Sequence, residues 1–217
     1  LRDILELVTH RIPNAKGFKS IQDIQVISPM KKGKVGVTNL NKELQAVLNP
    51  PSENRAQREF GMVIYREGDK VMQIKNNYRL KWEDANGFEE GEGIYNGDIG
   101  ILENINEGMK SFTILFNDGK RVLYDFEQMD EITHAYAMTV HKSQGSEFPV
   151  VVMPIVGGPP LFLNRKLLYT AVTRAKKLLI LMGSSYVFSQ MIKSGDSQER
   201  QTALRERIID YINNPMI

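Results

Sequence analysis

Arg174 lies toward the C-terminal end of the chain, within a segment whose apolar residues are spaced as on a helix. The spacing predicts a helix over residues 165–177. One face of that helix would be apolar, formed by Leu167, Leu168, Ala171, Val172 and Ala175. Another face would carry Arg174 with Lys166, Thr170 and Lys177. A guanidinium is always ionised and donates two parallel hydrogen bonds, so an arginine fixed there suits the terminal phosphate of a nucleotide. A surface or structural role is commoner for a lone helical arginine, and this alternative stays open.

A second group of chemically suited residues lies in the segment that joins two predicted strands, residues 139–149. The carboxylate of Glu147 suits ribose hydroxyls rather than phosphates, and Gly145 allows backbone to approach a ligand closely. Neutral donors such as Thr139 and His141 suit a sugar-phosphate backbone that is held and then released. Taken alone, His141 would more often be a satisfied buried histidine.

An α/β fold is needed to position these residues. Apolar runs predict buried strands at residues 24–28, 135–140, 150–156 and 178–182. Helical spacing predicts helices at residues 1–11, ended near Pro13, and at residues 39–49, 165–177, 184–192 and 201–212. Nearly continuous Val, Ile and Leu strands separated by helices indicate a parallel sheet covered on both faces.

The middle of the chain has a different pattern. Five short β-like runs are separated by turn signals, at residues 62–65, 71–75, 99–105, 111–116 and 122–124. They predict a small barrel inserted into the α/β domain, with residues 82–93 as a long exposed loop. The loop is similar to a calcium-binding loop only superficially, because Phe88 and Glu89 stand where an acid and a glycine are needed.

Composition excludes several functional classes. The chain of 217 residues is 41% hydrophobic and 25% charged, and its longest apolar runs are far shorter than the ~20 residues that cross a bilayer, so no membrane association is expected. It has no cysteine, which excludes disulfides, thiolate zinc sites and cysteine nucleophiles, and its three histidines make a multi-histidine metal centre improbable. It begins at Leu1 without a leader, so we expect a piece of a longer protein.

The net charge of +2 conceals an asymmetry. Residues 83–131 contain 13 acidic and 3 basic residues, or −10, which leaves 13 acidic and 25 basic residues elsewhere, or +12. An acidic block within a basic frame suggests two units, of which the basic one fits a polyanionic partner. An ordinary solvated acidic face explains the composition equally well.

Two segments together resemble a known family. Residues 139–149 (TVHKSQGSEFP) and residues 167–176 (LLYTAVTRAK) are similar to the fifth and sixth conserved motifs of superfamily-one helicases, above all in the RecD/TraA branch. Residues 25–30 with 36–41 are similar to the fourth-motif region of that branch. Residues 68–78 and 96–100 look like its inserted Src-homology-type (SH3-like) barrel, so the resemblance covers roughly residues 20–185.

The resemblance implies a role for each motif residue. The residues expected to contact single-stranded DNA are Thr139, His141, Lys142 and Ser143. The residues expected to face ATP are Gln144, Gly145, Glu147 and Arg174. Arg174 would be the catalytic arginine finger at the γ-phosphate.

Further contacts are expected outside the two motifs. The barrel would contact DNA through Lys75 and Asn76, with Asn77 and Tyr78 as additional candidates, although Tyr78 could instead cap the barrel. Many relatives outside the branch have an arginine in the fourth motif. This sequence has Lys31 and Lys32 there, and whether either one contacts a phosphate stays open.

The expected organisation follows from the resemblance. A RecA-like parallel sheet with helices on both faces, the second motor domain, would comprise residues 1–58 and 132–217, interrupted by an SH3-like barrel at residues 59–131. No phosphate-loop motif Gly-x-x-x-x-Gly-Lys-Ser/Thr occurs, and no magnesium-binding carboxylate follows a buried strand. In the family both lie on the preceding motor domain, which would therefore bind most of the ATP and Mg²⁺.

The resemblance implies that the longer protein is a bacterial, cytoplasmic, ATP-dependent 5'-to-3' DNA helicase. Its partners would be single-stranded DNA, ATP, the first motor domain of the same chain and, in some relatives, subunits of a nuclease complex. Two other classes stay open: a single-strand-binding module without motor activity, and an interaction domain whose acidic barrel binds a protein. The sequence does not decide between repair, recombination and conjugation.

Overall fold

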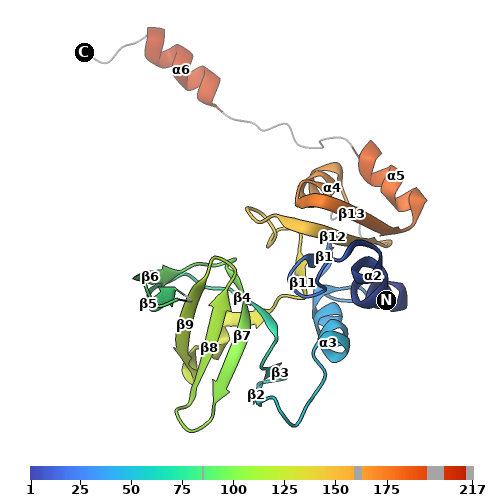
Figure 1. The fold of residues 1–217 in the computed structure, drawn as a ribbon. Coiled ribbons are helices and arrows are strands. Elements are labelled where there is room, and N and C mark those ends of the chain that lie inside the picture. The colour runs from blue at the N-terminus through green and yellow to red at the C-terminus, as the bar shows by residue number, and fades with distance from the viewer. Residues whose placement is uncertain (85, 159–162, 195–202, 214–217) are drawn as a thin grey trace.

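The computed structural model describes residues 1–84, 86–158, 163–194 and 203–213, and Figure 1 shows two sheets beside each other, one of them flanked by helices. The first sheet has the order β11-β1-β12-β13, and all its neighbouring strands run parallel. Its strands are β1 (Ile24–Ser28), β11 (Ala137–Thr139), β12 (Phe148–Ile155) and β13 (Ala175–Gly183). The predicted parallel sheet is thus confirmed.

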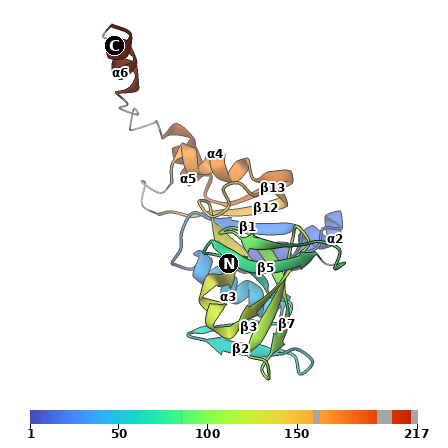
Figure 2. The same cartoon turned by 90° about the vertical axis from the view of Figure 1, so that its left-hand side faces the viewer.

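Helices cover both faces of this sheet, as Figure 2 shows for α3 on one side and α4 with α5 on the other. On the first side lie α1 (Arg2–Glu6), the π-helical turn η1 (Leu7–Arg11), α2 (Ile12–Lys16) and α3 (Val37–Leu48). On the second lie α4 (Arg165–Val172) and α5 (Ser185–Lys193). Alternate residues of β12 lie on opposite faces of the sheet. Val150 and Val152 pack toward α3, and Val151 and Met153 pack toward α4. The helix α6 (Leu204–Asn213) stands apart from both sheets in Figure 1, and residues 201–202 of the helix predicted there lie outside the described residues.

The first helical run does not end near Pro13. It continues through α2 to Lys16 and ends at Gly17, whose φ of 69° is the left-handed conformation that favours glycine. Pro13 stands at the second position of α2, directly after the π-helical turn η1, where the hydrogen-bonding pattern of the run changes.

The predicted helix over residues 165–177 is too long. It ends at Val172 because the hydroxyl of Thr173 bonds back to the carbonyl oxygens of Tyr169 and Thr170, each at 3.0 Å. Ala175 continues the helical spacing in the sequence, but in the structure it begins β13 and pairs with Phe148. Pairing with β12 therefore overrides the local pattern.

The second sheet has seven strands in the order β10-β4-β7-β8-β9-β5-β6 and forms the SH3-like domain. Its strands are β4 (Lys70–Gln73), β5 (Asn77–Asp84), β6 (Glu90–Ile94), β7 (Ile99–Asn106), β8 (Ser111–Phe116), β9 (Lys120–Asp125) and β10 (Ile132–His134). The 3₁₀ helix η2 (Phe126–Glu131) joins β9 to β10. Leu102, Phe112, Ile114 and Tyr124 are fully buried in its core.

Three predicted elements of this region differ in the structure. Most of the loop predicted at residues 82–93 belongs to the β5–β6 hairpin, whose turn closes because the Asp84 carboxylate accepts backbone N–H groups of Phe88 and Glu89. Residues 62–65 fall mostly in a separate hairpin of β2 (Gln57–Phe60) and β3 (Val63–Arg66). The strand predicted at residues 135–140 is shorter, and β10 just before it joins the barrel sheet.

The two sheets share a packed junction. Met72 and Ile99 of the barrel lie in the same apolar cluster as Val140 and Phe148 beside the parallel sheet. The side-chain nitrogen of Lys70 donates to the carbonyl oxygen of Ile24 at 3.3 Å. Within the described ranges, no helix combines the length and apolar character needed to span a membrane.

Candidate nucleotide and DNA site

Arg174 lies in the turn between α4 and β13, not on the helix. Its guanidinium donates three hydrogen bonds: Nε to the Thr170 carbonyl at 3.1 Å, Nη1 to the Ser146 carbonyl at 3.0 Å, and Nη2 to the Thr173 hydroxyl at 3.1 Å. A guanidinium has five N–H groups, so two are left for a ligand. The half-buried side chain is therefore held in place and still able to bind an anion.

The segment of residues 140–147 crosses the parallel sheet from one edge to the other. It starts where Thr139 pairs with Ser28, at the carboxyl ends of β11 and β1. It ends where Phe148 pairs with Ala175, at the amino ends of β12 and β13. The residues predicted to contact DNA therefore begin at one edge, whereas Glu147 and the arginine turn lie at the opposite edge.

The structure brings three of the four residues predicted to face ATP to this amino edge. Gly145 has a φ of 84°, and open space surrounds the position that a Cβ atom would occupy. The Glu147 carboxylate lies 3.1 Å from Nζ of Lys176, and both side chains are half exposed. Gln144 is also exposed; its backbone N–H donates to the His141 carbonyl at 3.3 Å, whereas its side-chain amide has no hydrogen-bond partner within the described residues.

A cleft of about 350 Å³ opens beside Glu147, between residues 146–149 and the barrel turns at residues 97–99 and 116–118. Its charged lining residues are Asp98, Asp118 and Glu147, of which Asp118 pairs with Lys120 and Glu147 with Lys176, so the lining itself offers no cation to a phosphate. Phosphate groups would therefore bind on the Arg174 side of Glu147. In the described part of the chain no three His, Asp or Glu residues group closely enough to hold a metal ion.

Ser143 does not lie where a DNA contact would place it. Its side chain is fully buried, and its hydroxyl donates to the Val140 carbonyl at 2.8 Å. The backbone N–H of Lys142 donates to the Thr139 hydroxyl at 3.3 Å, which closes the same turn. Ser143 therefore shapes the turn that presents its neighbours, and His141 is exposed on the outside of it.

Lys142 connects this turn to the barrel. Its ammonium donates to Asn96 Oδ1 at 2.7 Å, and the backbone N–H of Asn96 donates to Asn76 Oδ1 at 2.9 Å. Asn76 is thus part of a continuous polar chain that begins at the predicted DNA-facing turn. Lys75 is exposed and forms an ion pair with Asp130.

The remaining predicted residues are also placed. Asn77 Nδ2 donates to the Glu131 carboxylate, and Tyr78 is 64% exposed, so it does not cap the barrel core. Lys31 and Lys32 are exposed in the loop after β1. Because the carboxyl ends of parallel neighbours meet at one edge, this loop lies on the same edge as Thr139.

Sequence reasoning missed two participants. Asn96 belongs to an Asn-Gly-Asp turn that the sequence resemblance assigned to the barrel without a ligand role, and its side chain accepts a hydrogen bond from the Lys142 ammonium. The Ser146 carbonyl, which holds Arg174, is a backbone group without any sequence signal. Asn76 and Asn77 at the start of the β5–β6 hairpin and Asn96 after it were the available hint for the first.

A buried polar cluster joins the barrel, α3 and the strand β10. The carboxylate of Asp69 is fully buried and lies 3.0 Å from His134 Nε2, 2.8 Å from the Tyr136 hydroxyl and 2.7 Å from the side-chain amides of Gln45 and Asn49. Burial alone would raise the pKa of Asp69, but the hydrogen bonds and the attraction of His134 hold it below its ordinary value. Burial and the Asp69 charge raise the pKa of Tyr136. The cluster fixes the barrel to the helix that follows β1.

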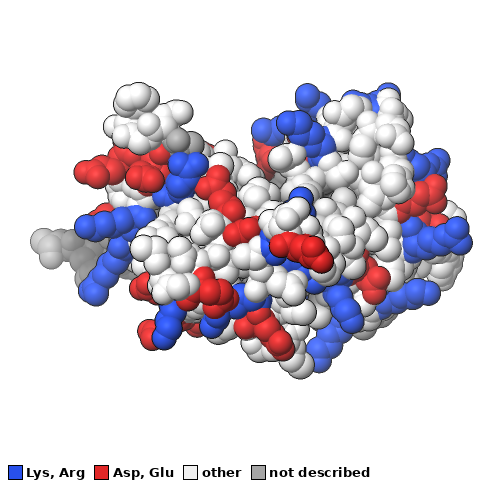
Figure 3. All heavy atoms as spheres, turned by 60° about the horizontal axis from the view of Figure 1, so that its bottom comes forward, with Lys and Arg blue, Asp and Glu red and all other residues white. Residues whose placement is uncertain are grey.

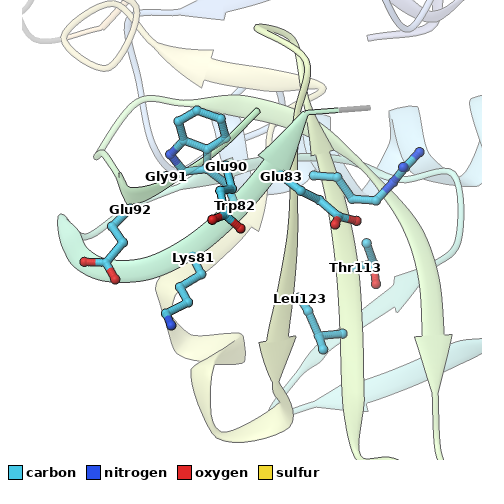
Figure 4. Close-up of a pocket in the computed structure, with 9 residues that line it drawn as sticks. Lys81, Trp82, Glu83, Glu90, Gly91, Glu92, Thr113 and Leu123 are labelled. Atoms are coloured by element: carbon cyan, nitrogen blue, oxygen red, sulfur yellow. The ribbon is translucent and has the colours of Figure 1, made fainter. Parts of the chain in front are cut away.

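Charges are distributed unevenly over the surface. Figure 3 shows acidic side chains mainly over the barrel half of the face it presents, whereas basic side chains predominate over the other half. A groove of about 620 Å³ lies on the outer face of the barrel, and Figure 4 shows its lining side chains on β5, β6, β8 and β9. Glu83, Glu90 and Glu92 line it together with Lys81 and Arg121. None of the predicted site residues contributes to this groove.

Comparisons with known families match both parts of the chain. Residues 40–116 match the model of the SH3 domain of ATP-dependent RecD-like DNA helicases. Residues 134–182 match the model of the C-terminal domain of UvrD-like helicases. The second match contains the turn of Thr139, the Glu147 loop and Arg174.

Similar whole proteins agree with these matches. The "ATP-dependent RecD2 DNA helicase" of Deinococcus radiodurans is 35% identical over 185 residues, which cover 85% of this chain and 23% of that protein. The "RecBCD enzyme subunit RecD" of Haemophilus influenzae is 29% identical over 211 residues, covering 91% of this chain and 28% of that protein. The chain thus spans about a quarter of the length of these relatives.

The fold also has a counterpart among solved structures. The Pif1 helicase from Bacteroides in complex with ADP-AlF3 and single-stranded DNA superimposes with a TM-score of 0.55 at 16% identity. The match covers 99% of this chain and 51% of that chain. The match covers nearly the whole of this chain, both sheets included, so its fold is similar to that of the matched structure.

Proposed function

The chain is related to the RecD-type superfamily-one DNA helicases through both of its domains, and from this relationship we propose that it is the second motor domain, with its inserted barrel, of an ATP-dependent DNA helicase. In this proposal residues 1–58 and 132–217 form the motor domain and residues 59–131 the insertion. A first motor domain of the same protein supplies the phosphate loop and the magnesium-binding carboxylate.

One observation carries the proposal: Arg174 and the Glu147 loop are joined at one sheet edge through the hydrogen bond to the Ser146 carbonyl. With two N–H groups left, the guanidinium is suited to the γ-phosphate of an ATP bound between two motor domains. The Glu147 carboxylate, next to the open backbone at Gly145, is suited to the ribose hydroxyls. Gln144 would line the same nucleotide.

ATP and Mg²⁺ supply the phosphoryl-transfer chemistry when they are bound between the two motor domains. The residues of this chain fit that role in charge and position, because Arg174 is cationic and fixed whereas the acidic cleft lies beyond Glu147. Arg174 neutralises charge that develops on the phosphate, and Glu147 orients the sugar. In this proposal the chain alone cannot hydrolyse ATP.

The opposite sheet edge is the proposed DNA track. Thr139, His141 and Lys142 lie on or beside one turn, and Asn76 with Lys75 extends it onto the barrel through Asn96. The ion pair of Lys75 with Asp130 is solvent-exposed, so exchange of Asp130 for a DNA phosphate costs little. Ser143 holds the turn and takes no direct part.

Coupling between ligands follows from the crossing segment. Residues 140–147 connect the DNA edge directly to the nucleotide edge, so closing of the ATP cleft around Arg174 would shift the turn that holds the strand. The resemblance to the RecD/TraA branch implies that these steps run in the 5'-to-3' direction. Such an enzyme would act in the bacterial cytoplasm, alone or with the subunits of a nuclease complex.

The test is an assay of the full-length protein on partial duplexes with either a 5' or a 3' single-stranded overhang. ATP-dependent unwinding from the 5' overhang, together with no ATP hydrolysis by residues 1–217 alone, supports the proposal. Robust magnesium-dependent hydrolysis by residues 1–217 alone would contradict the division of the active site between two domains. A single-strand-binding module without motor activity predicts binding of both overhangs and no unwinding of either.

The groove on the barrel favours a second candidate function, binding of a protein partner. Glu90 and Glu92 lie on the end strand β6 and have no ion-pair partner within the described residues. A basic extended segment fits their charge. Charge reversal, Glu90→Lys with Glu92→Lys, should weaken binding of such a partner while DNA binding is retained, and it preserves the β5–β6 pairing that deletion of residues 83–92 would destroy.

A further inference from the structure

Two tyrosines lie exposed and adjacent on the barrel. The side chain of Tyr78 is 64% exposed and that of Tyr95 is 45% exposed, and their ring centroids are 5.9 Å apart in an edge-to-face arrangement. Tyr78 follows Asn77, the residue that pairs with Ile94, so the two strands of the β5–β6 hairpin place the rings beside each other. Neither ring belongs to the apolar core of the barrel.

The local structure holds both rings in position. The Tyr78 hydroxyl accepts a hydrogen bond from Asn76 Nδ2 at 3.2 Å. Gly93 has a φ of 100°, which favours glycine, and a Cβ atom there would lie 2.9 Å from the Tyr95 hydroxyl in its present position. The backbone N–H of Tyr95 is fixed by Asp98 at 2.8 Å. The aromatic surface is therefore preformed.

The same residues connect the ring pair to the proposed DNA track. Asn76 contacts Tyr78 through its amide nitrogen and Asn96 through its amide oxygen, and Asn96 in turn receives the Lys142 ammonium. A DNA strand bound at Lys142 would therefore pass close to the two tyrosine rings. Carboxylates at Asp130 and Glu131 are also close, but they are engaged by Lys75 and Asn77 respectively.

We propose that Tyr78 and Tyr95 form a stacking site for unpaired bases of single-stranded DNA. The proposal rests on the proposed function, since it requires a strand that follows the Lys142 turn. An exposed aromatic ring stacks on any base, so the site would be independent of sequence, as a motor that moves along DNA requires. Paired bases of a duplex do not expose their faces, so the site selects single strands.

The experiment measures binding of residues 1–217 to an oligothymidylate and to the same oligonucleotide with abasic sites, at one fixed salt concentration. Tyr78→Ala and Tyr95→Ala should each weaken binding of the complete oligonucleotide about fivefold or more. Neither variant should weaken binding of the abasic oligonucleotide, which has no bases to stack. Tyr78→Phe should bind as the wild type does, because it retains the ring.

Tyr186→Ala is the matched control, because this tyrosine on α5 is 71% exposed and lies in the other domain. It should leave both affinities unchanged. Equal loss of affinity for both oligonucleotides in the Tyr78 and Tyr95 variants, or no loss for either, would overturn the stacking site while leaving the proposed function intact. Failure of the wild-type chain to bind the complete oligonucleotide at any salt concentration would instead contradict the DNA track itself.

Discussion

Nη1 of Arg174 donates a hydrogen bond of 3.0 Å to the carbonyl oxygen of Ser146, 28 positions earlier in the chain. Two further contacts join the same segments: the Phe148 N–H donates to the Arg174 carbonyl at 2.8 Å, and Lys176 pairs with Glu147. The arginine turn and the loop before β12 therefore form one unit. Under the proposed function, a change in nucleotide contact at either segment would therefore be transmitted to the other.

Replacing Arg174 by alanine in the full-length protein should reduce ATP turnover by about 10³-fold or more, because the charge that stabilises the transition state is removed. Arg174→Lys should restore little of the lost ATP turnover, since an ammonium lacks the forked geometry that reaches both Ser146 and a phosphate. Nucleotide affinity should change much less than turnover. Steady-state hydrolysis and equilibrium nucleotide binding measure the two effects, and unchanged turnover in Arg174→Ala would remove the finger assignment.

Glu147→Ala should raise the KM for ATP roughly tenfold, the effect of losing a hydrogen bond to a charged acceptor, with a smaller effect on kcat. If the carboxylate binds the 2'-hydroxyl, the increase in KM caused by Glu147→Ala should be smaller for 2'-deoxy-ATP than for ATP. Lys176→Ala is the control, because it releases Glu147 from its ion pair without removing the carboxylate. An identical KM ratio for the two nucleotides in wild type and Glu147→Ala would exclude a contact of Glu147 with the 2'-hydroxyl.

The sequence was sufficient for the elements whose pattern is local. Val150 to Ile155 is apolar throughout because both faces of β12 are covered, and this predicted the parallel sheet. The position of Arg174 was not predictable in the same way. Ala175 fits the helical spacing, and only the pairing with Phe148, a contact between distant residues, converts that stretch into a strand.

The candidate site shows the same limit. The residue types of the two motifs predicted which side chains are chemically suited, but Ser143 is buried by a turn that its own hydroxyl closes. The contact of Lys142 with Asn96 spans 46 positions, and no spacing rule relates the two residues. Positions fixed by contacts between distant segments required the structure.

The junction cluster predicts a large stability effect at Asp69. Asp69→Ala removes the acceptor of buried donors from Tyr136, Asn49 and Gln45, and the free energy of unfolding should fall by about 3–5 kcal/mol. Asp118→Ala, an exposed acid in a barrel turn, should change it by less than about 1 kcal/mol. Urea unfolding measures both. Equal small effects would show that the cluster contributes little to joining barrel and motor domain.

Asp69 should also make the stability of the folded chain fall at acidic pH. Because the pKa of Asp69 is lower in the folded chain than its ordinary 3.8, the stability that it contributes is complete above that value and is lost as the pH falls through the folded pKa. Wild type should therefore lose stability between neutral pH and strong acid more steeply than Asp69→Asn. Urea unfolding at a series of pH values below neutrality measures the difference, and parallel curves for the two proteins would refute it.

Lys70 should make stability rise with pH in the alkaline range. Burial lowers its pKa from 10.5 to about 7, so between these values the folded chain holds Lys70 neutral while the unfolded chain binds the proton. The unfolded state then binds more protons, and the free energy of unfolding should increase by up to about 1.4 kcal/mol per pH unit from this residue. Below pH 7 the cost of the buried charge is present in full.

Lys70→Met isolates this effect, because a side chain of similar length fills the same space without a charge. The variant should be more stable than wild type at pH 7, despite losing the bond to the Ile24 carbonyl, and the difference should shrink as the pH approaches 10. Lys75→Met, at an exposed lysine, is the control and should give a curve parallel to that of wild type. Urea unfolding at pH 7, 8, 9 and 10 tests this, and a pH-independent difference between Lys70→Met and wild type would mean that Lys70 remains charged in the folded protein.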